Sequence, residues 1–122
     1  NGPLPTEADE EHEQKLRTIG DEFGATTGRP RRCGWFDAVV ARYAVRVNGL
    51  TDLAVTKLDV LDTIPSIPIC VGYQLDGHPQ DDVPSGTATL GRVKPVYEVR
   101  EGWCRPRSFR QTRCRMRNSP SS

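Results

Sequence analysis

Two segments of the chain show apolar residues at helical spacing, and the first lies close to the N-terminus. After a turn-rich start, Thr6 followed by Asp9 resembles a capping box, and the acidic residues that follow suit the positive end of a helix. Leu16 and Ile19 supply a thin apolar stripe, and Gly20 is a plausible C-terminal stop. We therefore expect a surface helix whose acidic side chains need no catalytic role.

The second helical pattern is stronger and covers WFDAVVARYAVRVNG, residues 35–49. Its apolar residues recur every three or four positions, and Arg42 and Arg46 lie one turn apart. Asn48 and Gly49 are typical of a helix end. The pattern predicts a well-defined helix.

Three short apolar runs downstream predict strands. LAVTKLDVLD at 53–62 and IPSIPICVGYQLDG at 64–77 are rich in β-branched residues and bounded by Pro, Asp and Gly, and VKPVYEV at 93–99 is a further short strand. Asp76 and Gly77 indicate a turn. A helix that leads into apolar strands indicates an α/β fold, in which ligands gather at the carboxyl ends of strands.

Length and composition are those of one ordinary domain of 122 residues, with 35% hydrophobic residues. No run approaches the roughly 18 apolar residues of a membrane span, so we expect no membrane partner. The chain starts at Asn1 rather than Met, which we interpret as a cut inside a longer protein.

Cysteine and histidine positions do not predict a metal site. Cys33, Cys70, Cys104 and Cys114 form no Cys-x-x-Cys pair, and neither histidine falls at a ligand spacing. Cys70 lies inside an apolar run, where a buried free thiol is the common outcome. These features favour a reducing, cytoplasmic location.

Charge is distributed unevenly along the chain. Residues 1–14 carry five acids and no base, whereas residues 105–117 carry six arginines and no acid. Removing those arginines would change the net charge from +1 to −5, so the tail alone is basic. The segment 104–122 has no apolar periodicity, and we expect it to be disordered.

The stretch GATTGRPRRCGW, residues 24–35, carries the first candidate chemistry. Its glycines allow a close backbone approach, Thr26 and Thr27 offer hydroxyl donors, and Arg29, Arg31 and Arg32 offer planar forks for carboxylate or phosphate. The position directly before a helix favours an anion site. A flexible basic surface loop is the alternative interpretation.

Thr56-Lys57-Leu58-Asp59 is the second candidate. A carboxylate at Asp59 could accept hydrogen bonds from guanine N1–H and the exocyclic amine together, which adenine does not offer, and the stem of Lys57 could lie across the base. The tetrapeptide resembles the guanine-specificity motif of GTPases, with Thr in place of Asn. A solvated Lys and Asp at a strand end is the alternative.

Taken together, the two motifs in their order and spacing resemble adenylosuccinate synthetase. The likeness extends from GPLPTE through ICVGYQLDG to VYEVREGW, roughly residues 2–103, beyond which the Arg-rich tail diverges. The resemblance implies part of a mixed, largely parallel sheet with flanking helices, as in the P-loop-GTPase-like fold of that family. It also implies a cytoplasmic homodimer that condenses IMP with L-aspartate to adenylosuccinate, using GTP and Mg²⁺, in AMP biosynthesis.

The resemblance also implies residue roles. The aspartate and IMP loop would consist of Ala25, Thr26, Thr27, Gly28, Arg29, Pro30 and Arg31. Arg29 would also bind IMP, and Arg31 would reach the GTP phosphates. The guanine would be held by Lys57, Leu58 and Asp59.

Other parts of the family's site have no counterpart here. The N-terminal Gly-rich segment with the catalytic aspartate and a Mg²⁺ ligand, and the histidine that acts as general acid, match nothing in this sequence. His12 and His78 stand in the wrong context. We therefore expect no catalytic residue and no metal ligand in the chain, and no activity of the chain alone.

Three alternatives remain at the level of sequence. The chain could be a non-catalytic, partly folded truncated product, because half of an α/β sheet exposes apolar faces. It could also be a free-standing guanine-nucleotide switch, although the P-loop is missing. The Arg-rich tail could bind nucleic acid, but it lacks interleaved aromatic residues, so nucleic acid is not an expected partner.

Overall fold

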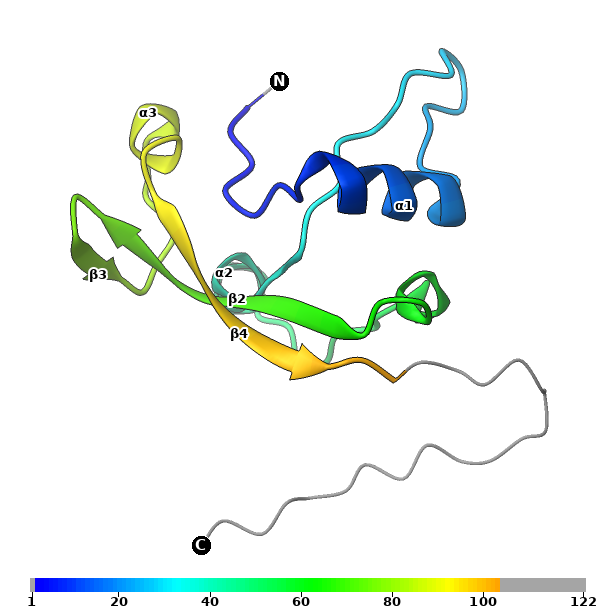
Figure 1. The fold of residues 1–122 in the computed structure, drawn as a ribbon. Helices are drawn as coiled ribbons and strands as arrows, with labels where there is room; N and C mark the ends of the chain where they lie inside the picture. The colour runs from blue at the N-terminus through cyan, green and yellow to red at the C-terminus, as the bar shows by residue number, and fades with distance from the viewer. Residues whose placement is uncertain (1, 104–122) are drawn as a thin grey trace, which may run out of the picture.

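The computed structural model describes residues 2–103, which form a four-stranded sheet with helices around it (Figure 1). The expected disorder of 104–122 lies outside the described residues. The elements in chain order are α1 (Glu10–Gly20), β1 (Phe36–Asp37), α2 (Ala38–Asn48), the 3₁₀ helix η1 (Leu58–Leu61), β2 (Ser66–Leu75), β3 (His78–Gln80), α3 (Thr87–Leu90) and β4 (Lys94–Glu101).

Strand β2 is the centre of the sheet. It pairs in parallel with β1 and in antiparallel fashion with β3 and β4. A mixed sheet is confirmed, but the expectation of a largely parallel one is wrong for the part of the chain described here. The reason is that Asp76 and Gly77, both with positive φ, make the predicted turn, so the chain reverses directly into β3.

Both long helices form within the predicted segments, but α2 begins only at Ala38, because Phe36 and Asp37 pair with β2 as β1. The predicted capping box at α1 is wrong. The side chain of Asp9, not Thr6, accepts a hydrogen bond from the His12 N–H and caps α1. Thr6 is buried, and its carbonyl accepts from the backbone N–H of Trp35 at 2.9 Å. Gly20 is the last residue of α1, and Asp21 makes the left-handed cap.

The predicted strand at 53–62 is also wrong. Residues 53–57 are exposed and have no regular structure, and η1 follows them. Within residues 2–103 no neighbouring strand pairs with this run, and Lys57 has a left-handed backbone that ends any extended conformation. Apolar β-branched residues alone are therefore insufficient here, because a strand needs a partner.

The buried side chains form two clusters, and β2 contributes to both. Ala8, Leu16, Ile64 and Ile67 join α1 to the start of β2, and Val39, Cys70, Tyr73 and Val93 join α2 to its second half. Cys70 is a fully buried free thiol, as predicted. The loop between α1 and β1 leaves the first cluster and protrudes beyond α1 (Figure 1).

Candidate functional site

The loop that follows α1 is closed at its base by backbone hydrogen bonds. Phe23 and Pro30 form an isolated antiparallel bridge, and the Gly24 N–H donates to the Arg29 carbonyl at 2.8 Å. The Gly28 N–H donates back to the Gly24 carbonyl at 2.8 Å, and Gly28 takes a φ of 64° that a side chain would disfavour. Because the family resemblance predicts substrate contacts here, we refer to residues 24–31 as the substrate loop.

The tip of the substrate loop faces solvent. Residues 25–31 are all exposed, so the predicted donors of Thr26, Thr27 and Arg29 are accessible to a ligand. Thr27 Oγ1 lies 3.4 Å from the Arg29 N–H and orders the turn between them. Exposed hydroxyl groups and a guanidinium on a closed loop suit the binding of a carboxylate.

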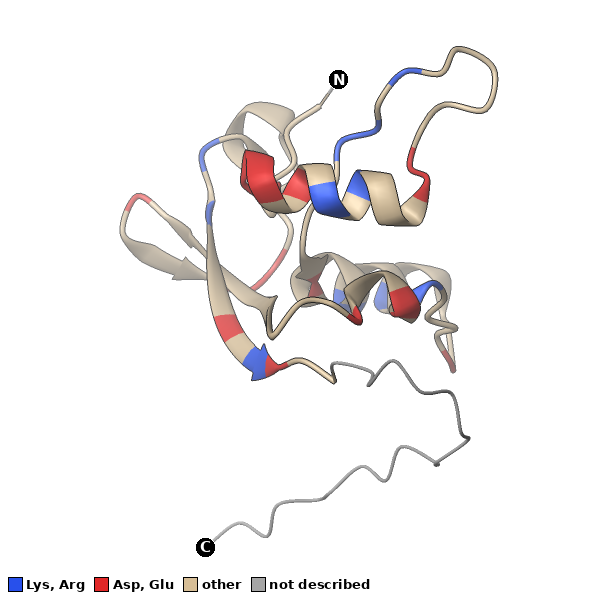
Figure 2. Ribbon diagram, turned by 45° about the vertical axis from the view of Figure 1, so that its right-hand side comes forward, with Lys and Arg blue, Asp and Glu red and all other residues tan. Residues whose placement is uncertain are grey.

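Figure 2 shows basic positions along the chain between α1 and β1, and the three arginines of this segment have different surroundings. Arg32 is a structural residue, since its guanidinium donates to both carboxylate oxygens of Glu7, at 2.6 and 2.9 Å, and to the Gly2 carbonyl. Arg31 donates to Glu22 at 3.2 Å. Arg29 has no acidic partner within residues 2–103.

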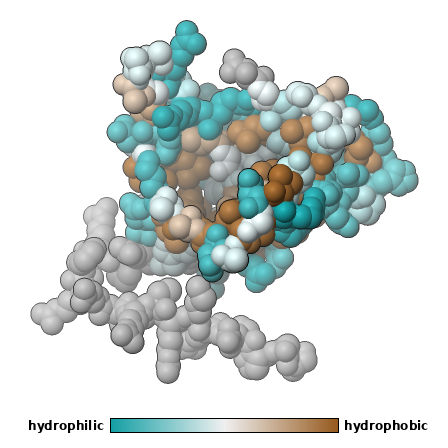
Figure 3. Space-filling model, turned by 180° about the vertical axis from the view of Figure 1, so that it is seen from behind, coloured by the Kyte–Doolittle hydropathy of each residue, from teal (hydrophilic) through white to brown (hydrophobic). Residues whose placement is uncertain are grey.

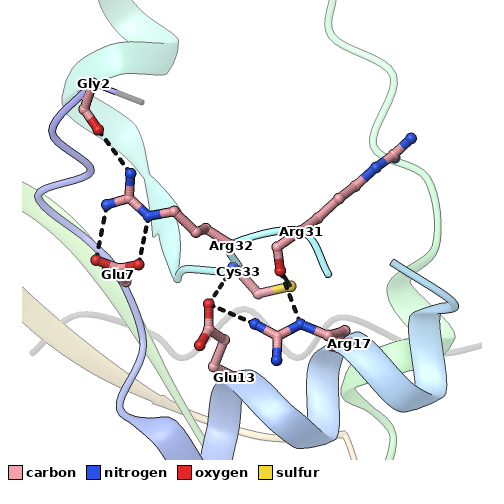
Figure 4. Close-up of polar contacts among 7 residues, drawn as sticks. All are labelled: Gly2, Glu7, Glu13, Arg17, Arg31, Arg32 and Cys33. Carbon is pink, nitrogen blue, oxygen red and sulfur yellow. Dashed lines mark hydrogen bonds and ion pairs between the residues drawn. The ribbon is translucent and has the colours of Figure 1, made fainter. Parts of the chain in front are cut away.

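Helix α1 supports the end of the substrate loop from below (Figure 4). Arg17 donates from Nε to the Arg31 carbonyl at 3.0 Å and pairs with Glu13 at 2.9 Å. Glu13 in turn accepts from the Cys33 N–H at 3.1 Å. Burial raises the pKa of the Cys33 thiol, which keeps it neutral in this position. The side chain of Arg31 extends away from this group.

Lys57 and Asp59 lie at the start of η1, below the substrate loop. Lys57 Nζ donates to the Gly20 carbonyl and to Glu22 Oε1, each at 2.9 Å. Leu58 and Asp59 are exposed, and the Asp59 carboxylate has no hydrogen bond to another described side chain. The carboxylate is thus available to accept from a ligand.

Glu22 joins the two predicted motifs. Its Oε1 accepts from Lys57 and its Oε2 from Arg31, although these residues lie 35 and 9 positions away in the sequence. The hydrogen bond from Lys57, followed by the one from Arg31, holds the pKa of the Glu22 carboxyl below its usual range. The structure therefore brings the substrate loop and the Lys-x-Asp motif together.

Sequence reasoning did not identify Glu22, Glu7, Glu13 or Arg17. The only available clue was an acid directly before a loop rich in arginine, which suggests a local partner for Arg31 but says nothing of Lys57. Long-range ion pairs leave no pattern in a single sequence, because they depend on which segments the fold makes adjacent.

Among residues 2–103, no group of three or more His, Cys, Asp or Glu residues could hold a metal ion, and no helix is long and apolar enough to cross a membrane. The Mg²⁺ that the family resemblance implies therefore has no cluster of protein ligands in this part of the chain.

Comparison with known proteins gives a consistent result. The family model described as adenylosuccinate synthetase matches residues 1–116. The adenylosuccinate synthetase of Mycobacterium tuberculosis strain H37Rv is 58% identical over 103 residues, and that of Bifidobacterium longum strain DJO10A is 59% identical over 102. These matches cover 84% of this chain.

A solved structure matches in fold as well. The fully ligated adenylosuccinate synthetase from Plasmodium falciparum superposes with a TM-score of 0.80 and 36% identity, covering 86% of this chain and 26% of that one. The chain spans 24% of the length of the curated relatives it matches. On the family match and these identities, the chain belongs to the adenylosuccinate synthetase family.

Proposed function

We propose that this chain forms the L-aspartate loop and the guanine-binding segment of an adenylosuccinate synthetase. The family is a ligase of AMP biosynthesis. The reaction assigned to it joins IMP and L-aspartate with GTP. Since the chain spans 24% of its relatives, we assign it the binding of these ligands rather than the complete reaction.

The substrate loop offers the groups that a dicarboxylate needs. The hydroxyls of Thr26 and Thr27 donate to the carboxylates of L-aspartate, and the guanidinium of Arg29 binds a carboxylate in a fork. Ala25, Gly28 and Pro30 shape the tip between these donors, which keeps the backbone close to the ligand. Arg29 also faces IMP.

The Lys-x-Asp segment reads the guanine of GTP. Asp59 accepts from N1–H and the exocyclic amine, and the Lys57 stem packs along the base, with Leu58 between them. Arg31 reaches toward the GTP phosphates from the substrate loop. Adenine offers no donors to Asp59, so it would leave the carboxylate unpaired.

One observation carries the proposal: Glu22 holds Arg31 and Lys57 on one carboxylate, so the substrate loop and the Lys-x-Asp motif share one site. L-aspartate and GTP must meet in one active site, and this arrangement supports such a meeting. Mg²⁺, which would offset phosphate charge, and a homodimer in the cytoplasm belong to the same proposal and rest on family membership alone.

A second candidate is a non-catalytic, partly folded product. Large apolar side chains remain exposed on β1, on α2 and on the segment that follows α2, including Phe36 at 51%, Val47 at 61% and Leu53 at 53%. Figure 3, seen from behind, shows apolar side chains gathered on that side of the molecule. Such a face is typical of a part that packs on further protein.

The test of the proposed function is Asp59→Asn in the full 122-residue chain. Xanthine carries an oxygen where guanine carries its exocyclic amine, so an asparagine side chain donates to xanthine and loses an acceptor for guanine. We expect GTP affinity to fall by about 10- to 100-fold and xanthosine triphosphate affinity to rise, the range for one mismatched charged hydrogen bond.

Isothermal titration calorimetry with GTP and with xanthosine triphosphate measures the two affinities. Asp52→Asn is the matched control, because Asp52 is exposed and lies before the motif. Equal affinity of the wild-type chain for GTP and ATP would refute guanine recognition. Loss of GTP binding without a gain in affinity for xanthosine triphosphate would show that Asp59 does not contact the base.

A further inference from the structure

Glu22 has the least exposed side chain of the three-residue group that joins the two motifs, which consists of Glu22, Arg31 and Lys57. Its N–H donates to the Arg17 carbonyl at 2.9 Å, and its carbonyl accepts from the Arg31 N–H at 3.0 Å, so its backbone is bonded on both sides. Its side chain is 28% exposed, against 58% for Arg31 and 59% for Lys57. The carboxylate is the anchored partner, and the two cations are its exposed partners.

Gly20 makes room for this arrangement. A Cβ added at Gly20 would lie 3.3 Å from Glu22 Cγ and 3.6 Å from Val60 Cγ2, so the side chain of Glu22 fills the space that glycine leaves beside η1. The Gly20 carbonyl is also the second acceptor for Lys57 Nζ, at 2.9 Å. Lys57 is therefore fixed by two acceptors from the end of α1.

Arg31 is held less completely than Lys57. Its side chain has one hydrogen bond to Glu22, at 3.2 Å, and the same carboxylate already accepts from Lys57 at 2.9 Å. An incoming phosphate would offer Arg31 a stronger bidentate partner, whereas Lys57 would keep its two acceptors. The two cations thus respond differently to an anionic ligand.

We propose that Glu22 is a positioning residue for nucleotide binding. It orients Lys57 for the guanine, and it binds Arg31 until a nucleotide phosphate takes the place of the Glu22 carboxylate. This inference rests on the proposed function, because it assumes that guanine binds at Lys57 and Asp59. Glu22 then has two opposite effects on nucleotide affinity. Glu22 strengthens the binding of the base and competes with the binding of the phosphates.

The first experiment tests, without any ligand, whether Lys57 and Arg31 both bind the Glu22 carboxylate. We call this arrangement the bridge. In the 122-residue chain, the carboxyl pKa of Glu22 is followed by carbon NMR in the wild type, in Lys57→Gln and in Arg31→Gln. Each substitution removes a cation that stabilises the carboxylate, so the pKa of Glu22 should rise in both. Glu11, which pairs with Lys15 on α1, is the internal control and should titrate unchanged.

The second experiment tests the positioning role with Glu22→Gln. Guanosine, which carries no phosphate, should bind about two- to fivefold more weakly, the range for loss of an exposed ion pair. The ratio of GTP to guanosine affinity should increase at least about twofold, because Arg31 no longer has a competing carboxylate. Glu11→Gln, which removes a comparable exposed pair on α1, should leave both affinities unchanged.

These readouts separate the possible failures. An unchanged pKa of Glu22 in both substitutions would overturn the bridge. An equal loss of guanosine and GTP affinity in Glu22→Gln would show a purely structural role and overturn the positioning. Absence of any nucleotide binding to the wild-type chain would refute the proposed function and the positioning role with it, while the titration would still decide whether the bridge exists.

Discussion

Lys57 has an unusual backbone for its residue type. Within residues 2–103, three non-glycine residues have positive φ, namely Asp21, Lys57 and Asp76. Aspartate tolerates this conformation because its short side chain bonds locally, whereas for lysine it costs about 1–2 kcal/mol. A strained residue next to a candidate ligand contact is typical of a functional position. Lys57 is held by specific contacts, whereas Asp59 is exposed, and the guanine-binding role of the motif stays a prediction.

This strain predicts a difference between two truncations of Lys57. Lys57→Gly and Lys57→Ala both remove the contacts to Gly20 and Glu22, but only glycine relieves the left-handed backbone. We expect the glycine variant to be more stable by about 1 kcal/mol and both to lose guanosine binding. Urea unfolding of the two variants measures this, and equal midpoints would mean that the backbone at position 57 is not left-handed in solution.

The two long helices differ in how their N-termini are held. Asp37 caps α2 by accepting from the Val39 and Val40 N–H groups at 2.9 and 3.1 Å, and its second oxygen accepts from the hydroxyl of buried Tyr73. Burial, followed by this contact, raises the pKa of Tyr73. Asp9 caps α1 at the surface. The cap of α2 is therefore part of a core cluster, and that of α1 is not.

We expect Asp37→Ala to destabilise the chain more than Asp9→Ala. The first loses a cap and leaves the buried Tyr73 hydroxyl without its acceptor, a loss of about 2–4 kcal/mol. The second loses only a cap at the exposed surface, so its free energy of unfolding should fall less. Free energies of unfolding in urea provide the comparison. A similar loss in the two variants would contradict the coupling of α2 to the core.

At the scale of the whole molecule, the N-terminal segment holds the substrate loop to the body. Backbone bonds join Thr6 to Trp35 and Ala8 to Cys33, and Gly34 passes so close that a Cβ there would lie 2.6 Å from the Thr6 carbonyl oxygen. The guanidinium of Arg32 lowers the pKa of Glu7 across the same contact. Stability and loop position are therefore linked through this junction.

The Glu7–Arg32 pair predicts a pH-dependent stability difference. Glu7 ionises in the unfolded chain at about pH 4.5 and at lower pH in the folded chain. Its contribution is therefore present above pH 4.5 and is lost as the pH falls through the lower folded value. Arg32→Gln should be less stable than wild type at pH 7, and the gap should narrow at lower pH.

Urea unfolding between pH 7 and acidic pH measures this gap. Lys94→Gln is the control, because it removes one positive charge from a residue of β4 that forms no ion pair with Glu7. A stability difference between wild type and Arg32→Gln that is constant with pH would show that the pair adds nothing beyond packing.

Local patterns in the sequence determined the two long helices, the Asp76–Gly77 turn and two of the three predicted strands, those at 64–77 and 93–99. They also identified the residue types of both motifs and the family. Caps, turns and apolar periodicity act over a few residues, so a single sequence records them. The strand expected at 53–62 is the exception, because forming it requires a neighbour that no local pattern specifies.

Only the tertiary structure decided which charges are paired within the fold and which are left without an acidic partner. Arg29, Arg31 and Arg32 are alike in sequence, yet Arg32 binds Glu7, Arg31 shares Glu22 with Lys57, and Arg29 has no acidic partner in the part of the chain that the structure describes. The physical reason is that an ion pair depends on distance in space, and only folding brings residues that lie 25 or 35 positions apart into contact.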